Sequence, residues 1–213
     1  MALEIVVGPM FSGKTTYIIE TYNKLNKKID ENYNSCLAID FSDKPHRKGF
    51  IISHSGDSIE CINCNKLYTL CNDIENRIEF LKADYIFINE AQFFEDLKEW
   101  VLFTLKTFNK KIFIVGLDLD FKRKIFGQIH SLKPYSRMIL NLKGKCSLCN
   151  FQSEYSHRIS DNYEQILMDC NQYIPLCRKC WEEKNPEKIK FIHHIEFNNN
   201  IYNNVDIIMG MKC

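Results

Sequence analysis

Eight residues near the beginning of the chain combine glycines with a lysine and a hydroxyl side chain, a set of groups that binds phosphate. They follow the apolar run Leu3–Val7 and fit the pattern G-x-x-x-x-G-K-[ST]; in order they are Gly8, Pro9, Met10, Phe11, Ser12, Gly13, Lys14 and Thr15. In this pattern successive backbone N–H groups point at a phosphate, and the helix that follows adds its positive N-terminal end. We therefore expect Lys14 to reach the β- and γ-phosphates of ATP and Thr15 to bind Mg²⁺.

A carboxylate follows a later apolar run, Tyr85–Ile88, after a single asparagine. In P-loop proteins the residues at this end of a strand organise Mg²⁺ and supply the catalytic base. Asn89 stands where the metal-side carboxylate is expected, which predicts weaker metal binding with activity retained. Glu90 is then the candidate base for a substrate hydroxyl that attacks the γ-phosphate. A solvated loop carboxylate is the simpler alternative.

Four of the 10 cysteines form two C-x₂-C pairs, Cys146 with Cys149 and Cys177 with Cys180. Each pair presents two thiolates to one ion, and two pairs complete the closed tetrahedral shell of a structural Zn²⁺ site. The stretch between the pairs, residues 150–176, is longer than the about 15–20 residues of a minimal zinc ribbon, which suggests a second role for it. Cys61, Cys64 and Cys71 lack an evident fourth ligand, and we interpret them as independent thiols.

The elements that must position these groups alternate between strands and helices. Apolar runs predict buried strands and amphipathic stretches predict helices: strands at Leu3–Val7, Cys36–Ile39, Tyr85–Ile88 and Ile112–Val115, and helices at 15–25 and 94–108. This alternation predicts an α/β fold with a mostly parallel sheet of the P-loop NTPase type, helices on both faces, and a small zinc-binding domain after it.

The composition excludes some classes of partner. The 213 residues are 45% hydrophobic, and 28 Lys+Arg against 27 Asp+Glu leave a formal charge of +1, so there is no global basic field for nucleic acid or an anionic membrane. We find no run long enough to span a bilayer and no secretory signal, and we expect a cytoplasmic protein.

Two motifs together carry a family resemblance. Residues 8–15 and the stretch Glu90-Ala91-Gln92-Phe93-Phe94 resemble the thymidine kinase family that animals, bacteria and large DNA viruses share. The resemblance continues through Leu117–Lys124 and Phe126-Gly127, similar to the family block L-D-x-x-F-x-R-x-x-F-G, and it includes the paired cysteines. It implies a P-loop α/β domain over 1–143, a zinc-binding lasso domain over 144–184 and an Asn-rich tail over 185–213.

The same resemblance assigns roles to single residues. Glu90 matches the base that deprotonates the 5′-hydroxyl of the nucleoside, and Asn89, Gln92 and Arg47 match positions near the nucleotide phosphates. The lasso is expected to fold over the nucleoside. Positions that match the nucleoside pocket are Met10, Phe93, Leu117, Phe121, Ser156, Glu164, Gln165, Ile166, Leu167, Met168 and Tyr173. From the residues alone, Phe93 fits the core as well as the pocket.

The implied activity is transfer of the γ-phosphate of ATP to the 5′-hydroxyl of thymidine, giving thymidine 5′-monophosphate, in a homo-tetramer or dimer with Mg²⁺ and structural Zn²⁺. Deoxyuridine stays a candidate substrate, because one methyl group is worth about 1–3 kcal/mol at most. Asn89 and the step Met168-Asp169, where the family has Asp and Gly-Gly, leave open a nucleoside-binding homologue with impaired catalysis. A zinc-ribbon ATPase driven by nucleic acid is a further alternative.

Overall fold

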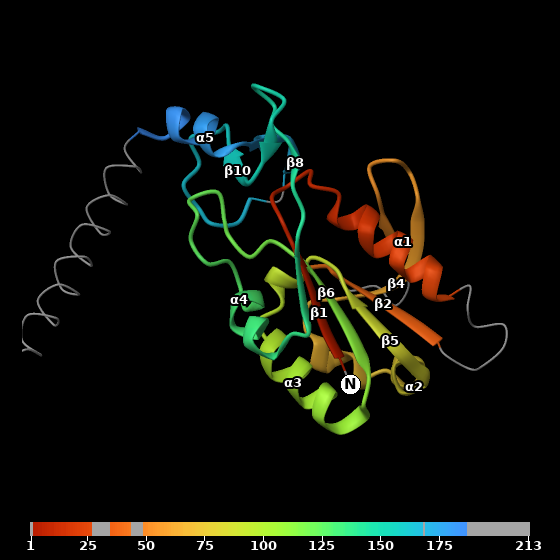
Figure 1. Cartoon of the computed structure of the whole chain (residues 1–213). Coiled ribbons are helices and arrows are strands. Elements are labelled where there is room, and N and C mark those ends of the chain that lie inside the picture. The colour runs from red at the N-terminus through yellow and green to blue at the C-terminus, as the bar shows by residue number, and fades with distance from the viewer. Residues whose placement is uncertain (1, 27–34, 44–48, 168, 187–213) are drawn as a thin grey trace, which may run out of the picture.

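The computed structural model describes residues 2–26, 35–43, 49–167 and 169–186. Arg47, Met168 and the tail beyond residue 186 lie outside this part of the chain. Two units follow one another: a sheet domain and a small unit built on the cysteine pairs (Figure 1).

The sheet has seven strands in the order β3-β4-β2-β5-β6-β1-β7, and all neighbours are parallel except the β3–β4 hairpin. The fold class predicted from the sequence is therefore confirmed. The strands are β1 Ala2–Val7, β2 Ser35–Phe41, β3 Gly49–Ile52, β4 Ser58–Cys64, β5 Ala83–Ile88, β6 Lys111–Gly116 and β7 Met138–Asn141.

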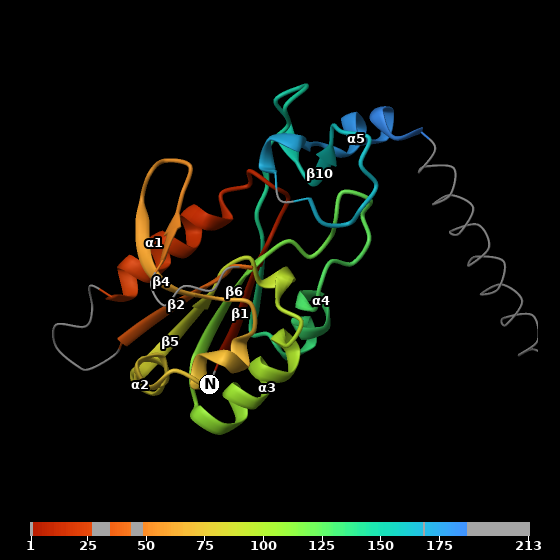
Figure 2. The ribbon, with the colours of Figure 1, turned by 180° about the vertical axis from the view of Figure 1, so that it is seen from behind.

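Helices cover both faces of the sheet, with α1 on one face and α3 on the other (Figure 2). Alternate side chains of each central strand point to opposite faces, so Ile5 packs beneath α3 while Val6 packs beneath α1. Both side chains are fully buried. The helices of this domain are α1 Lys14–Asn26, α2 Ile74–Lys82, α3 Leu97–Phe108 and α4 Ile129–Leu132.

Helix α3 begins three residues later than its apolar spacing predicts. Residues Ala91–Phe93 form a separate 3₁₀ turn, and Glu90 before it has a positive φ of 48°. This turn ends β5 sharply and holds Glu90 at the edge of the sheet.

The small unit lies at the carboxyl ends of the parallel strands, above the loop that joins β1 to α1 (Figure 1). It contains two short hairpins and one helix: β8 Gly144–Lys145 with β9 Gln152–Ser153, β10 Tyr155–Arg158 with β11 Tyr173–Leu176, and α5 Arg178–Lys184. Trp181 is fully buried in its core. Asn185 is buried as well, so the packed chain extends one residue past the predicted boundary at 184.

The described helices include none with both the length and the apolar character needed to cross a membrane.

Candidate functional site

The loop between β1 and α1 has the curled shape that its glycines predict. A Cβ on Gly8 would lie 2.4 Å from the Leu142 carbonyl oxygen, and Gly13 has a φ of +84°. The Lys14 ammonium donates to the carbonyl oxygens of Gly8, at 3.1 Å, and Pro9, at 2.7 Å. Burial lowers the pKa of Lys14 to about 8, although the nearby Glu90 carboxylate opposes this.

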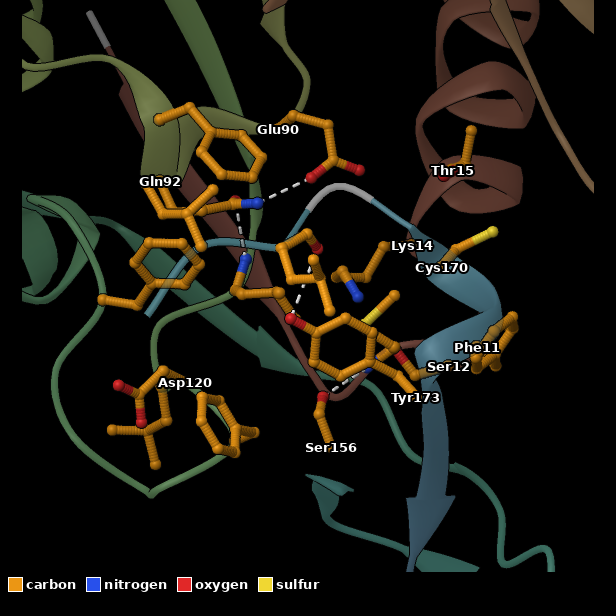
Figure 3. A pocket seen from close by; sticks show the side chains of 18 of the residues that line it. Phe11, Ser12, Lys14, Thr15, Glu90, Gln92, Asp120, Ser156, Cys170 and Tyr173 are labelled. Atoms are coloured by element: carbon orange, nitrogen blue, oxygen red, sulfur yellow. Dashed lines mark hydrogen bonds between the residues drawn. The ribbon is translucent and has the colours of Figure 1, made fainter. Parts of the chain in front are cut away.

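Glu90 is tied to the next strand through a buried glutamine. Gln92 Nε2 donates to Glu90 Oε2 at 2.6 Å, and Gln92 Oε1 accepts from the Leu117 backbone N–H at 2.9 Å (Figure 3). Gly127, with a φ of +62°, approaches the Gln92 backbone so closely that a Cβ there would lie 2.1 Å from its carbonyl oxygen. The Glu90 carboxylate is therefore held by a fixed neighbour.

Asn89 forms a pair with an acidic residue on the adjacent strand. Its Nδ2 donates to Asp40 Oδ1 at 2.9 Å. Burial, with a further contribution from the Glu90 charge, raises the pKa of Asp40 to about 6, and the hydrogen bond from Asn89 only partly offsets this. The sequence analysis missed Asp40. The sequence did contain a signal for it, because an acidic residue directly follows the apolar run Cys36–Ile39. That run ends at the same edge of the sheet as β5.

A cavity of about 330 Å³ joins the P-loop to the small unit (Figure 3). The sequence-predicted residues that line it are Met10, Phe11, Ser12, Gly13, Lys14, Thr15, Glu90, Gln92, Phe93, Leu117, Phe121, Ser156, Gln165, Ile166, Leu167 and Tyr173. Gly8 and Pro9 line a neighbouring cavity of about 220 Å³. Asn89 and Glu164 do not line the larger cavity, and Arg47 and Met168 fall outside the described residues.

Other residues of the wall were not expected from the sequence. Phe41 and Phe126 both contact the Phe93 ring, which resolves the ambiguity over Phe93: it packs in an aromatic cluster and also lines the cavity. His54 contacts the Phe11 ring from the β3–β4 hairpin. The remaining unexpected lining residues are Thr16, Leu119, Asp120 and Cys170.

A hydrogen bond links the P-loop directly to the small unit. The Met10 backbone N–H donates to Ser156 Oγ at 2.9 Å, across 146 positions of sequence. Ser156 lies on β10, so the strand pair that carries Tyr173 is fixed relative to the phosphate loop.

The four paired cysteines come together as a metal site requires. Their sulfur atoms all lie within 4.8 Å of one another, and Cys146, Cys177 and Cys180 are buried. Burial of the Cys146 thiol is outweighed by hydrogen bonds from backbone groups of Cys177, Leu148 and Cys149, and the pKa of Cys146 falls to about 6. Four soft thiolate ligands with no open position fit structural Zn²⁺.

The glycine-rich loop ahead of α1, the strand-end carboxylate and the four-cysteine unit above them are the combination expected of a nucleotide-binding protein of the P-loop class. A family model described as "Thymidine kinase" matches residues 1–181. The chain belongs to the thymidine kinase family.

Viral and plant relatives agree with this assignment. The chain is 36% identical over 187 residues to the thymidine kinase of Yaba monkey tumor virus, covering 86% of this chain and 96% of the relative. It is 35% identical over 188 residues to the thymidine kinase of Amsacta moorei entomopoxvirus, covering 85% and 98%. It is 28% identical over 180 residues to the thymidine kinase of Oryza sativa, covering 83% of this chain and 65% of the plant protein.

Proposed function

We propose that this protein is a thymidine kinase that transfers the γ-phosphate of ATP to the 5′-hydroxyl of thymidine, yielding thymidine 5′-monophosphate and ADP. One observation carries the proposal. Lys14 of the phosphate loop, the Glu90 carboxylate and the Phe121 ring all line the same cavity, so a phosphate, a hydroxyl and a flat base can be bound together.

In this proposal Glu90 orients the 5′-hydroxyl and accepts its proton. Phosphoryl transfer needs positioning and charge stabilisation more than covalent chemistry, and Lys14 with the loop N–H groups supplies them around the β- and γ-phosphates. Gln92 keeps the Glu90 carboxylate turned toward the cavity through its 2.6 Å hydrogen bond.

The nucleoside would lie between Phe121 and Tyr173, which line the cavity from two different units of the fold. Met10, Phe93 and Leu117 add apolar walls, and Gln165, Ile166 and Leu167, which line the cavity, would supply backbone groups for the base edge. A cavity of about 330 Å³ favours a pyrimidine over the larger purine.

Oxygen donors suited to Mg²⁺ are present beside the phosphate loop. We propose that Thr15 binds the ion and that Asn89 Oδ1 accepts from a metal-bound water, since its Nδ2 is engaged by Asp40. The ion would neutralise charge on the β- and γ-phosphates.

Transfer of labelled phosphate from ATP to thymidine is the decisive assay, and Glu90→Gln is its informative variant. The new glutamine still accepts the hydrogen bond from Gln92 but cannot take up the proton of the 5′-hydroxyl. We therefore expect kcat to fall by about 10²–10⁴-fold, with little change in the KM for ATP or the KM for thymidine. Glu95→Gln, an exposed change on the same segment, is the matched control and should retain full activity.

The two alternatives give different results in the same experiment. A nucleoside-binding protein with impaired catalysis would bind thymidine in calorimetry without transferring label. An ATPase driven by nucleic acid would hydrolyse ATP faster with DNA and not with thymidine.

Assembly and location are parts of the same proposal. Strand β7 ends the sheet with Met138 and Ile139 exposed, an apolar edge that suits a homodimer or tetramer. Light scattering after size exclusion would detect either state. The free thiols of the described residues suit a reducing compartment such as the cytoplasm.

A further inference from the structure

Arg158 is a buried cation whose role neither the motifs nor the relatives assign. It is the last residue of β10, and only 5% of its surface is exposed. A buried guanidinium must replace its lost hydration with well-placed hydrogen bonds, so the groups that it contacts indicate why it is retained.

The hydrogen bonds of Arg158 converge on the lid, which we define as residues 162–167. Nη1 donates to the carbonyl oxygens of Asn162, at 2.9 Å, and Glu164, and Nη2 donates to the carbonyl oxygen of Gln165 at 3.2 Å. The planar guanidinium of Arg158 thus donates to three carbonyl groups of the lid.

The same guanidinium also fixes the two rings that would enclose the nucleoside. Its central carbon lies 3.8 Å from the centre of the Phe121 ring and 4.9 Å from that of Tyr173. Nε donates to the Tyr173 hydroxyl at 3.1 Å, and that hydroxyl lies 3.3 Å from the Leu167 carbonyl oxygen, to which it donates. Because the hydroxyl is engaged within the lid, the ring of Tyr173 is what remains for a ligand.

Further side-chain hydrogen bonds join the lid to the loop that carries Phe121. Gln165 Nε2 donates to Asp120 Oδ2 at 3.0 Å, and Lys122 Nζ donates to the Tyr163 carbonyl oxygen at 2.5 Å. Gln165 and Tyr163 are both exposed, so water competes for these bonds. The Arg158 guanidinium is buried, and its hydrogen bonds to the Tyr173 hydroxyl are buried as well, so water competes least for these.

We propose that Arg158 is a positioning residue that holds the lid closed against Phe121 and thereby sets the affinity for the nucleoside. This inference rests on the proposed function, because the ligand of that cavity is taken to be thymidine. A lid that is already ordered lowers the entropic cost of binding. Arg158 lies outside the lining of the cavity, so it contacts neither the phosphates nor Glu90.

The test compares Arg158→Lys with Arg137→Lys, the same change at an exposed arginine. Lysine keeps the charge but cannot donate to several lid carbonyls at once. We expect Arg158→Lys to raise the KM for thymidine by about ten- to a hundred-fold while the KM for ATP, kcat and zinc content stay within about twofold of the wild type. Arg137→Lys should change none of them.

Hydrogen exchange of the ligand-free protein gives a second readout that does not depend on turnover. Amides of residues 162–167 should exchange faster in Arg158→Lys, with β1 and β6 unchanged. Tyr173→Phe, which removes only the hydroxyl, should produce a smaller change in the same direction.

Two results would overturn the role of Arg158: a KM for thymidine within twofold of the wild type, or equal increases in both KM values. The proposed function fails separately, if the wild-type protein does not phosphorylate thymidine. Faster exchange in the lid of Arg158→Lys would still support the closing role in that case.

Discussion

The ionised carboxylate of Asp40 lowers the stability of the folded protein. Its pKa is raised from 3.8 to about 6, mainly by burial, so the folded state disfavours the ionised form. The resulting loss of stability is fully present above the folded-state pKa of about 6, shrinks as the pH falls, and is absent only well below pH 3.8, where Asp40 is protonated in both the folded and the unfolded state.

Asp40→Asn should therefore raise the free energy of unfolding by about 1–3 kcal/mol at pH 7 and by almost nothing at about pH 3. The asparagine still accepts from Asn89, so the hydrogen bond is kept. Urea unfolding at the two pH values, with EDTA present, measures the difference. An equal gain at both would contradict the assignment of the cost to ionisation.

The pairing of Asn89 with Asp40 changes what Asn89→Asp is expected to do. On its own this substitution places two carboxylates where the structure has a 2.9 Å hydrogen bond, and we expect it to destabilise the protein by about 1–3 kcal/mol at pH 7. The swapped double variant Asp40→Asn/Asn89→Asp restores one amide and one acid. It should recover the stability and lower the Mg²⁺ concentration needed for half-maximal turnover.

The sequence could predict groups whose chemistry depends on a local pattern. Lys14 and each C-x₂-C pair of cysteines belong to short motifs with fixed spacing, so the residues that define each motif are neighbours in sequence. Asp40 and Arg158 act through residues on other strands and loops. Their partners, Asn89 and Tyr173, could be found only after the strands were paired.

Among the elements, the short turn after β5 depends on Gly127, a residue outside the sequence of the turn itself. Gly127→Ala must place a Cβ 2.1 Å from the Gln92 carbonyl oxygen at a φ of +62°. We expect a loss of about 2–5 kcal/mol in stability and a fall in kcat, because Gln92 holds Glu90.

Gly56→Ala is the matched control for this prediction. Gly56 also has a positive φ, +91°, but nothing lies within 4 Å of its Cβ position. It should lose about 1–2 kcal/mol, with kcat unchanged. Similar losses for both variants in urea unfolding would show that backbone strain alone matters.

The central strands were predictable because they are buried on both faces and read as continuous apolar runs. Strands β3, β4 and β7 were missed. In β4 the polar Glu60 and Asn63 alternate with buried residues, and β7 is a four-residue edge strand with little burial. Helix α2 was missed as well: its Ile74, Ile78 and Leu81 have helical spacing but are exposed, and Phe80 is the buried residue.

At the scale of the whole molecule, the four-cysteine unit and the sheet domain have separate cores. Cys149→Ser removes one ligand from the metal site, and we expect loss of zinc to raise the KM for thymidine by at least about tenfold before the sheet unfolds. Far-UV circular dichroism and metal analysis would accompany the kinetics. Cys71→Ser, at an exposed thiol of the sheet domain, is the control.

Full affinity for thymidine in a zinc-free Cys149→Ser protein would show that the lid does not need the metal. A simultaneous loss of the sheet would show that the two cores fold as one.

In the proposed function, the hydrogen bond from the Met10 N–H to Ser156 Oγ would make the binding of the two substrates interdependent. One partner belongs to the loop that receives ATP, and the other to the strand pair that covers the nucleoside. If thymidine shifts this contact, it changes the affinity for ATP by some factor, and thermodynamic linkage requires ATP to change the affinity for thymidine by the same factor. Each substrate then acts as an effector of the other, within a single subunit and without a separate regulatory site.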